Sequence, residues 1–286
     1  MENFLLPHLV EQFINHLKSQ GKSEFTLIAY KKDLEQFAGY LTANEIQDVR
    51  EVKKDQIEGF VNKLIADNYT KKSASRKLNS IRTFFRFLKN EGLITHNPSL
   101  DVSHPKYTIS PPRILSKLEY RALRDFAKED PRTYALVEVL LQTGIKIGEL
   151  ANLQVSDVKD NHLHIRAYGK TPERDVPLNK AAKKAINNYL AVRGKTDNDH
   201  LFITRTGHQL LVRNIRQIIT RCFQEVGIEK ATVNDLRNTF IAHQLINGAS
   251  IEYIAKIVGH RRLSSTERFL KLIKQEAERK EKLGEL

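Results

Sequence analysis

The chain has 286 residues, 40% of them hydrophobic and 28% charged, with a formal net charge of +13; this is typical of a globular protein with room for two domains. No apolar run is long enough to span a bilayer, and the first residues lack the basic segment of a signal peptide, so we expect a cytoplasmic protein. A single cysteine, Cys222, excludes an internal disulfide framework and a zinc site of several cysteines, and its helical spacing from apolar neighbours predicts a core position.

Residues 1–100 show helical periodicity in four successive segments, and Gly21 is suited to cap the end of the first. The spacing predicts a compact four-helix bundle. In the fourth segment, residues 71–89, there are seven basic residues and no acidic one. Such a surface favours a polyanionic partner, above all nucleic acid, over a merely solubilising cationic face. The basic side chains that we predict to contact DNA, lying mostly away from the apolar seam, are Lys71, Lys72, Arg76, Lys77, Arg82 and Arg86.

The bundle is predicted to end at Asn97-Pro98, and residues 101–113 lack periodicity and contain three prolines, which indicates a linker. A second domain, residues 114–286, should begin with a helix capped by Ser116. An almost wholly apolar segment around residues 132–144 predicts a buried central helix. Alternating apolar residues then predict a β-hairpin with its turn near Gly169, and helices return after residue 208. The last residues, 274–286, have the pattern of an exposed amphipathic tail.

Three segments of this second domain, residues 140–158, 168–178 and 233–272, together resemble the tyrosine recombinases, also called the phage integrase family, and in particular its Xer type. The stretches "SEFTLIAYKKDLEQF" and "SASRKLNSIRTFFRFL" are similar to the core-binding domain of that family. The resemblance implies a mainly α (α+β) fold, in which a four-helix SAM-like domain precedes a mostly helical catalytic-type domain with a small antiparallel sheet. It further implies a clamp around double-stranded DNA.

The resemblance also implies a chemistry that needs no metal and no cofactor. In the family, a tyrosine hydroxyl attacks a DNA phosphodiester, and the resulting 3′-phosphotyrosine stores the energy of the broken bond. Two arginines, a lysine and two histidine-type residues stabilise the crowded phosphate in the transition state. Arginine suits this task because its planar fork makes two parallel hydrogen bonds to phosphate oxygens.

Four family positions are intact in this chain. Lys170 matches the general-acid lysine of the hairpin, Arg237 matches the second phosphate-binding arginine, and His260 matches a histidine that binds the phosphate. Glu149 matches an acidic residue that supports the site. Taken singly, each of the three basic side chains is better explained as an ordinary surface, turn or helix-end residue. Their joint occurrence in a matching framework reverses this and favours function.

Three positions depart from the family. Lys146 stands where the family has an arginine, Asn234 replaces a histidine, and Phe269 occupies the position of the attacking tyrosine. Lysine keeps the charge but loses the bidentate fork, whereas an amide at position 234 still donates a hydrogen bond. Phenylalanine has no attacking oxygen, and no tyrosine follows it in the chain. We therefore expect no strand cleavage.

Two hypotheses follow from the substituted nucleophile. In the first, the chain is a site-specific recombinase-family DNA-binding protein that cannot cleave, including a natural regulator such as a repressor or architectural partner. In the second, it is an enzyme that uses another nucleophile, or an altered form of an active parent. In either case the resemblance implies that copies of the chain assemble on DNA as dimers or tetramers, linked through the tail. It also implies that the protein does not bind a membrane.

Overall fold

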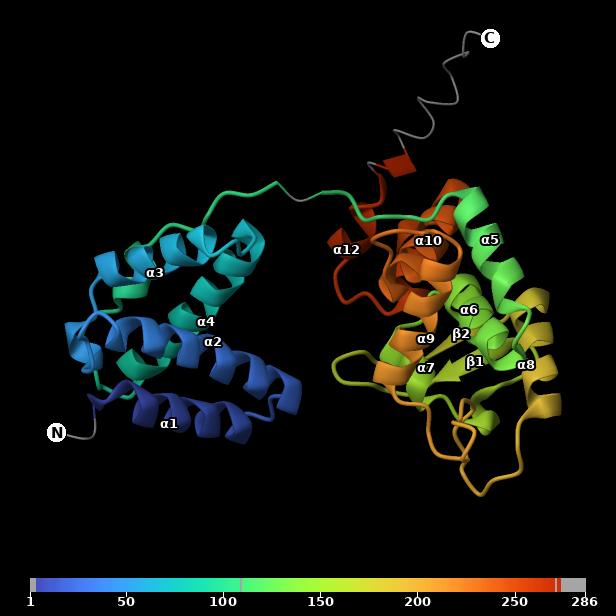
Figure 1. Ribbon diagram of the computed structural model, residues 1–286, viewed down its shortest axis with the longest axis horizontal. Helices are drawn as coiled ribbons and strands as arrows, with labels where there is room; N and C mark the ends of the chain where they lie inside the picture. Colours follow the sequence, from blue (N-terminus) through green and yellow to red (C-terminus); the bar gives the residue numbers. More distant parts are fainter. Residues whose placement is uncertain (1–3, 109, 271, 274–286) are drawn as a thin grey trace, which may run out of the picture. The chain divides into compact units, whose positions relative to one another are not determined.

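The computed structural model describes residues 4–108, 110–270 and 272–273. The chain divides into two compact units, Met1–Ile109 and Ser110–Leu286 (Figure 1). Within the described residues, no helix combines the length and the apolar character needed to cross a bilayer. The predicted tail, residues 274–286, lies outside the described residues.

The first unit contains the four predicted helices, α1 (Leu6–Ser19), α2 (Glu24–Thr42), α3 (Lys54–Ala66) and α4 (Lys71–Asn90). Two short 3-10 helices, η2 (Val49–Glu51) and η3 (Pro98–Asp101), complete it. As predicted, Gly21 follows the end of α1 with a left-handed φ of +69°, which an L side chain rarely adopts. The core is aromatic: Phe84 packs edge-on against Phe13 and Phe85, with ring centroids 5.6 and 5.7 Å apart.

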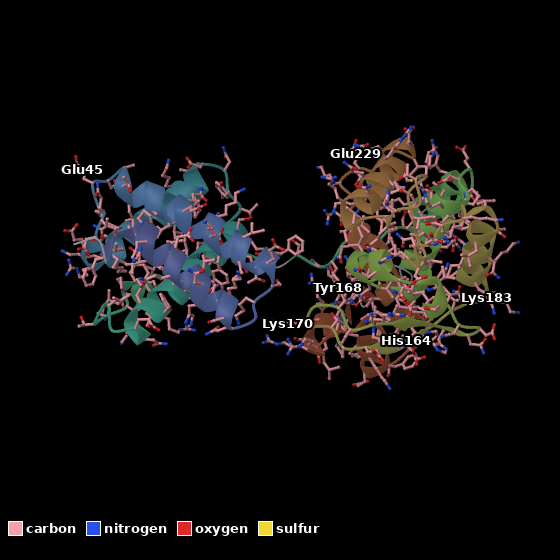
Figure 2. The ribbon with its side chains drawn as sticks, turned by 90° about the horizontal axis from the view of Figure 1, so that it is seen from below. Glu45, His164, Tyr168, Lys170, Lys183 and Glu229 are labelled. Carbon is pink, nitrogen blue, oxygen red and sulfur yellow. The ribbon has the colours of Figure 1, made fainter. Side chains whose placement is uncertain are left out.

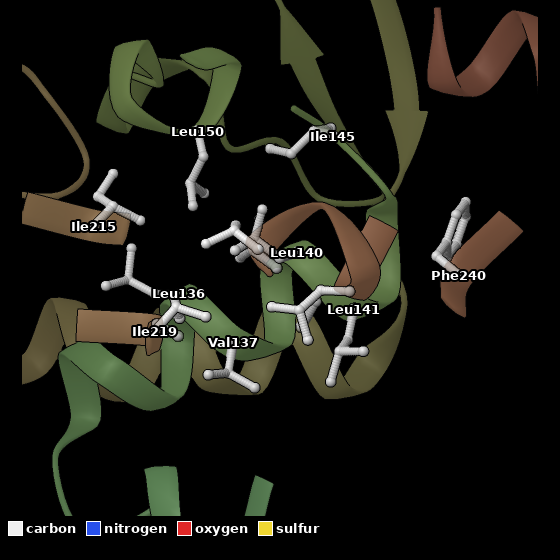
Figure 3. Packing of buried hydrophobic residues seen from close by; sticks show 14 of the residues in the cluster. Leu136, Val137, Leu140, Leu141, Ile145, Leu150, Ile215, Ile219 and Phe240 are labelled. Carbon is white, nitrogen blue, oxygen red and sulfur yellow. The ribbon is translucent and has the colours of Figure 1, made fainter. Parts of the chain in front are cut away.

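The second unit is built around α6 (Pro131–Thr143), whose apolar residues are buried as the sequence predicts. Around it pack α5 (Lys117–Ala127), α8 (Lys180–Val192), α9 (Val212–Glu225) and α10 (Val233–Ile246) (Figure 1). Figure 3 shows this core, with Leu136 and Leu140 of α6 among Leu150, Ile215 and Ile219. The remaining helices are α7 (Ile147–Asn152), η4 (Val155–Asp157), α11 (Ile251–Val258) and α12 (Ser264–Glu267).

The predicted hairpin consists of β1 (His162–Ile165) and β2 (Arg174–Pro177), paired antiparallel with Leu163 opposite Val176. Leu163, Ile165 and Val176 are buried, so one face of the hairpin covers the core and the other is polar. The sequence pattern predicts that the first strand extends to Ala167, but β1 ends at Ile165.

Three further sequence predictions have clear outcomes. Ser116 caps α5 by accepting the Glu119 backbone N–H, as predicted. Cys222 is buried in the core, also as predicted. Val102, within the predicted linker, is buried in the core of the first unit, because the chain folds back onto α4 after η3. The first unit therefore extends beyond residue 100.

Candidate functional site

The N-terminus of α7 holds a buried carboxylate that organises the surrounding cations. Glu149 accepts hydrogen bonds from Arg174 Nη1 and Nη2, at 3.0 and 2.9 Å. It also accepts the backbone N–H of Lys146 at 2.8 Å, which caps the helix. Both partners of the Arg174–Glu149 ion pair are almost completely buried. A buried pair of this geometry is stable only while both charges remain.

Arg174 connects three segments that are far apart in the sequence. It lies at the start of β2, binds Glu149 of α7, and donates its Nε–H to the Ile257 carbonyl of α11 at 2.5 Å. Gly259, with φ of +68°, lies directly against it: a Cβ there would come within 3.0 Å of Arg174 Cζ and 2.6 Å of Thr171 Cγ2. The sequence did not single out Arg174. The signals that could have identified it are its place within residues 168–178, which resemble the family, and its pairing with buried Ile165 in a half-buried hairpin.

Arg237, on α10, is also buried, with 5% of its surface exposed. Its Nη1 donates to the Gly144 carbonyl at 2.5 Å and its Nη2 to the Val258 carbonyl at 2.7 Å. Burial, followed by the nearby charge of Arg174, lowers the pKa of Arg237 to about 10, although Glu149 opposes this shift. The guanidinium is therefore charged at neutral pH and held in place by two backbone carbonyls.

Lys146 lies immediately before α7 and directs its ammonium group to the hairpin. Its Nζ donates to Thr171 Oγ1 and lies 4.0 Å from a Glu149 carboxylate oxygen. Burial, followed by the charges of Arg237 and Arg174, lowers the pKa of Lys146, and Glu149 acts in the opposite direction. The lysine thus belongs to the same cationic cluster as the two arginines.

His260 follows α11 and pairs its Nδ1 with Thr266 Oγ1 at 2.8 Å. Burial, followed by the positive charges of Arg237, Lys146, Arg268 and Arg174, lowers the pKa of His260 to about 4. His260 is therefore neutral at neutral pH. Three cations, Lys146, Arg174 and Arg237, lie around a single carboxylate, which makes the cluster electrostatically suited to an anion.

Two predicted site residues are exposed and, among the described residues, are not bonded to this cluster. Lys170 occupies the two-residue turn between Tyr168 and Thr171, where it is exposed and projects from the unit (Figure 2). Asn234 is exposed on α10, and its amide donates to Asn238 Oδ1 at 3.4 Å. Within the described residues, neither side chain forms a hydrogen bond or ion pair with Glu149 or the cations around it.

Phe269 belongs to the hydrophobic core of the second unit, with 2% of its surface exposed. Its backbone N–H donates to the Thr266 carbonyl at 3.0 Å, and the Thr266 hydroxyl in turn pairs with His260. The structure places the chain segment next to His260 and packs the ring in the apolar core, as a side chain in the position of the tyrosine would pack. That the ring lies beside the phosphate site stays a prediction from the sequence.

The basic helix α4 differs from its predicted role as an open cationic face. Lys77, predicted to lie on a DNA-binding face, is buried and donates to Asp33 of α2 at 2.9 Å. Arg76 makes a bidentate pair with the same carboxylate at 2.5 and 2.8 Å, and Ser80 donates at 2.8 Å. Burial alone would raise the pKa of Asp33, but these hydrogen bonds lower it overall. The Asp33 charge is therefore neutralised inside the bundle.

Arg82 is likewise committed to a structural role. It donates to the carbonyls of Ser99 and Val102 and pairs with His104, which fixes the chain after η3 against α4. Of the six predicted DNA-binding cations, those that are exposed and form no ion pair within the described residues are Lys71, Lys72 and Arg86. The described residues hold no cluster of three or more histidine, cysteine or acidic side chains arranged for a metal ion.

The low pKa of His260 leads to a testable pH dependence of stability. Between about pH 6.5 and pH 4 the unfolded chain binds a proton at His260 that the folded chain does not. The free energy of unfolding should therefore fall as the pH falls through this window, by up to about 3 kcal/mol. Denaturant unfolding of the wild type and of His260→Gln at several pH values measures this. In His260→Gln, the free energy of unfolding should depend less steeply on pH between pH 6.5 and pH 4 than in the wild type. An equal pH dependence in the two proteins would contradict the prediction.

Comparison with known proteins gives a consistent result for the whole chain. The sequence profile of the phage integrase family matches residues 113–276, and that of the phage integrase N-terminal SAM-like domain matches residues 10–92. A tyrosine recombinase XerC of Thermodesulfovibrio yellowstonii is 34% identical, over 90% of this chain and 89% of the relative. A tyrosine recombinase XerC of Listeria innocua is 32% identical, over 93% of this chain and 94% of the relative.

Solved structures share the fold. A lambda integrase dimer bound to a COC′ core site matches with a TM-score of 0.79 at 18% identity, over 91% of this chain and 97% of that chain. A lambda integrase tetramer bound to a Holliday junction matches with a TM-score of 0.77 at 19% identity, over 90% of this chain and 78% of that chain. The XerA recombinase matches at 26% identity with a TM-score of 0.56, over 98% of this chain and 100% of that chain. The predicted mainly helical fold is confirmed.

Proposed function

Because the chain belongs to the phage integrase family of tyrosine recombinases, we propose that it binds a specific double-stranded DNA site as a homo-oligomer without cleaving it. The observation that carries this proposal is the combination of a cationic cluster, Lys146, Arg174 and Arg237, with a nucleophile position filled by buried Phe269. Similar proteins bind DNA as dimers and tetramers, which supports the same partner and assembly here.

The cationic cluster is proposed to bind one phosphate of the DNA backbone. Arg237 and Lys146 supply fixed positive charge, and neutral His260 supplies a ring nitrogen for hydrogen bonding. Glu149 and Arg174 hold these groups in place by joining α7, β2 and α11. Exposed Lys170 and Asn234 would contact the DNA from the edge of this site. The cluster thus retains the electrostatic part of recombinase chemistry and lacks the covalent part.

The first unit is proposed to act as the core-binding domain of the family, joined by a linker to the second. Its exposed cations, Lys71, Lys72 and Arg86, would neutralise backbone phosphates. Arg76 and Lys77, which the sequence predicts to contact DNA, contribute less to phosphate binding than the exposed cations, because both are paired with Asp33. Binding by such contacts should weaken steeply as the salt concentration rises.

A nicked suicide substrate tests whether the chain cleaves. The DNA duplexes that the wild-type chain enriches from a randomised pool are nicked at each position near their centre and incubated with the protein. We expect a retarded complex on a native gel and no protein–DNA adduct in SDS, because Phe269 has no hydroxyl group to attack the phosphate.

The same experiment distinguishes the alternative function. An adduct that survives SDS would show that another side chain is the nucleophile and would overturn the non-cleaving proposal; peptide mapping of the adduct would then identify that residue. The absence of any enriched DNA would overturn specific DNA binding itself.

A further inference from the structure

Thr171, in the turn of the hairpin, is a buried polar residue that faces the cationic cluster of the second unit. Its hydroxyl oxygen accepts a hydrogen bond from the ammonium group of Lys146. Within the described residues, this is the only hydrogen bond that the ammonium group forms. Thr171 is 7% exposed, whereas the Lys146 side chain is 38% exposed. A ligand can therefore reach the lysine more readily than the threonine that holds it.

The backbone around Thr171 is fixed in a tight turn. Its N–H donates to the Tyr168 carbonyl at 3.0 Å, and the Tyr168 N–H donates to the Thr171 carbonyl at 3.1 Å. Between them lie Gly169, with φ of +59°, and exposed Lys170 (Figure 2). The turn packs on α7, since a Cβ at Gly148 would come within 2.6 Å of Tyr168 Cε1. Thr171 is thus held at a fixed place relative to the start of α7.

The methyl group of Thr171 orients its hydroxyl group. A Cβ at Gly259 would come within 2.6 Å of Thr171 Cγ2, so the methyl group occupies the space that this glycine leaves open. Threonine carries its methyl and hydroxyl groups on the same Cβ atom, and rotation about χ1 is restricted. The contact with Gly259 therefore also fixes the direction of Oγ1, which is toward Lys146.

The ammonium group of Lys146 needs such a fixed acceptor, because a lysine has a flexible stem and lacks the planar fork of arginine. Glu149 lies 4.0 Å from Nζ, beyond hydrogen-bond distance, and attracts the ammonium group without fixing its direction. The bond to Thr171 uses one of the three N–H groups and leaves two for a phosphate. An ammonium group that is already in place loses less conformational freedom when it binds an anion.

We propose that Thr171 is a positioning residue for phosphate binding, whose hydroxyl group orients the Lys146 ammonium toward the bound DNA phosphate. The hydroxyl group acts through the lysine, since it is buried and the lysine is partly exposed. It supplies part of the orientation that an arginine carries in its own planar fork. This inference rests on the proposed function and names the residue that orients one of its phosphate-binding cations.

Neutral methylphosphonates in DNA test the inference with the full-length protein. The duplex that the wild type enriches is prepared with one methylphosphonate at each position near its centre in turn, and affinities are measured for the wild type and Lys146→Ala. The phosphate that Lys146 binds is the one whose neutralisation weakens the wild type more than it weakens Lys146→Ala. Thr171→Val, which keeps the methyl group and loses the hydroxyl group, is then compared with Thr171→Ser, which keeps the hydroxyl group.

Thr171→Val should bind the unmodified duplex about 2- to 12-fold more weakly than the wild type. This loss should disappear on the duplex in which the phosphate bound by Lys146 is neutral, because the hydroxyl group acts only through that contact. Thr171→Ser should recover most of the loss. The matched control is Thr239→Val, since Thr239 is also 7% exposed and its hydroxyl group bonds only backbone groups within the described residues. Any loss in this control should be the same on both duplexes.

Every other outcome counts against the inference. If the wild type enriches no duplex, the proposed function fails and the inference fails with it. If no phosphate depends on Lys146, or if Thr171→Val binds both duplexes as the wild type does, the inference alone is overturned. The same holds if Thr171→Val weakens both duplexes equally, as a merely structural residue would. Thermal unfolding shows whether Thr171→Val folds, and Thr171→Ala gives the same comparison where valine prevents folding.

Discussion

The double variant Lys146→Arg, Phe269→Tyr is expected to form a covalent protein–DNA adduct about 10²- to 10³-fold faster than Phe269→Tyr alone. The tyrosine restores the attacking oxygen on a segment that already leads, through Thr266, to His260. Lysine at position 146 bonds Thr171 as a point charge and cannot make the bidentate contact of arginine with a phosphate. Adduct formation on nicked duplexes, followed over time in SDS gels, measures both rates.

The controls for this experiment use the same substrate. Lys146→Arg alone should bind the duplex and form no adduct, because Phe269 remains. Equal rates for the single and double variants would show that Lys146 is already sufficient, contrary to the prediction. If both tyrosine variants bind DNA but form no adduct, the predicted recovery of cleavage is wrong. Exposed Asn234 or the placement of Lys170 would then also prevent catalysis.

Glu149→Ala is expected to lower the free energy of unfolding by about 3–5 kcal/mol. The substitution leaves the guanidinium of Arg174 buried without its carboxylate, close to the charges of Arg237 and Lys146. It also removes the acceptor that caps α7. Chemical denaturation of the wild type and the variant at neutral pH measures the difference.

A matched control is Asp125→Ala in the same unit. Asp125 pairs with Lys128 at 2.7 Å, but both side chains are largely exposed, so the loss should be within about 0.5 kcal/mol. If Glu149→Ala lowers the free energy of unfolding by as little as Asp125→Ala does, the conclusion that the ion pair organises the site is wrong. Phosphate binding by the cluster should weaken in Glu149→Ala even under conditions where the variant is folded.

The basic helix shows the limit of a sequence pattern. Helical periodicity correctly predicts the apolar seam of α4, since Leu78, Ile81, Phe85 and Leu88 are all buried. The same pattern does not show which cations on the other faces are free. Asp33 lies more than forty residues earlier in the chain, and only the packing of α2 against α4 brings it to Arg76 and Lys77.

Arg174 illustrates the same limit at the candidate site. Motif spacing identifies Lys146, Glu149, Arg237 and His260, because each belongs to a short segment with a family pattern. Arg174 lies within residues 168–178, a segment that resembles the family, but no single motif position identifies it. Its importance appears only when β2, α7 and α11 meet. Conversely, Lys170 matches a family motif, but among the described residues it forms no hydrogen bond or ion pair with the cluster, since the hairpin turn projects from the unit (Figure 2).

Residue identities and their spacing along the chain were sufficient to predict the family, the four helices of the first unit, the hairpin of the second and the absence of a hydroxyl at Phe269. These features depend on residue identity and on short-range periodicity, which a single chain displays directly. Which charges are neutralised, and that the Phe269 ring is buried in the core, became clear only from the folded structure. Those properties arise from contacts between residues far apart in the chain. Local sequence patterns cannot predict such contacts, because they report only on residues that are close in sequence.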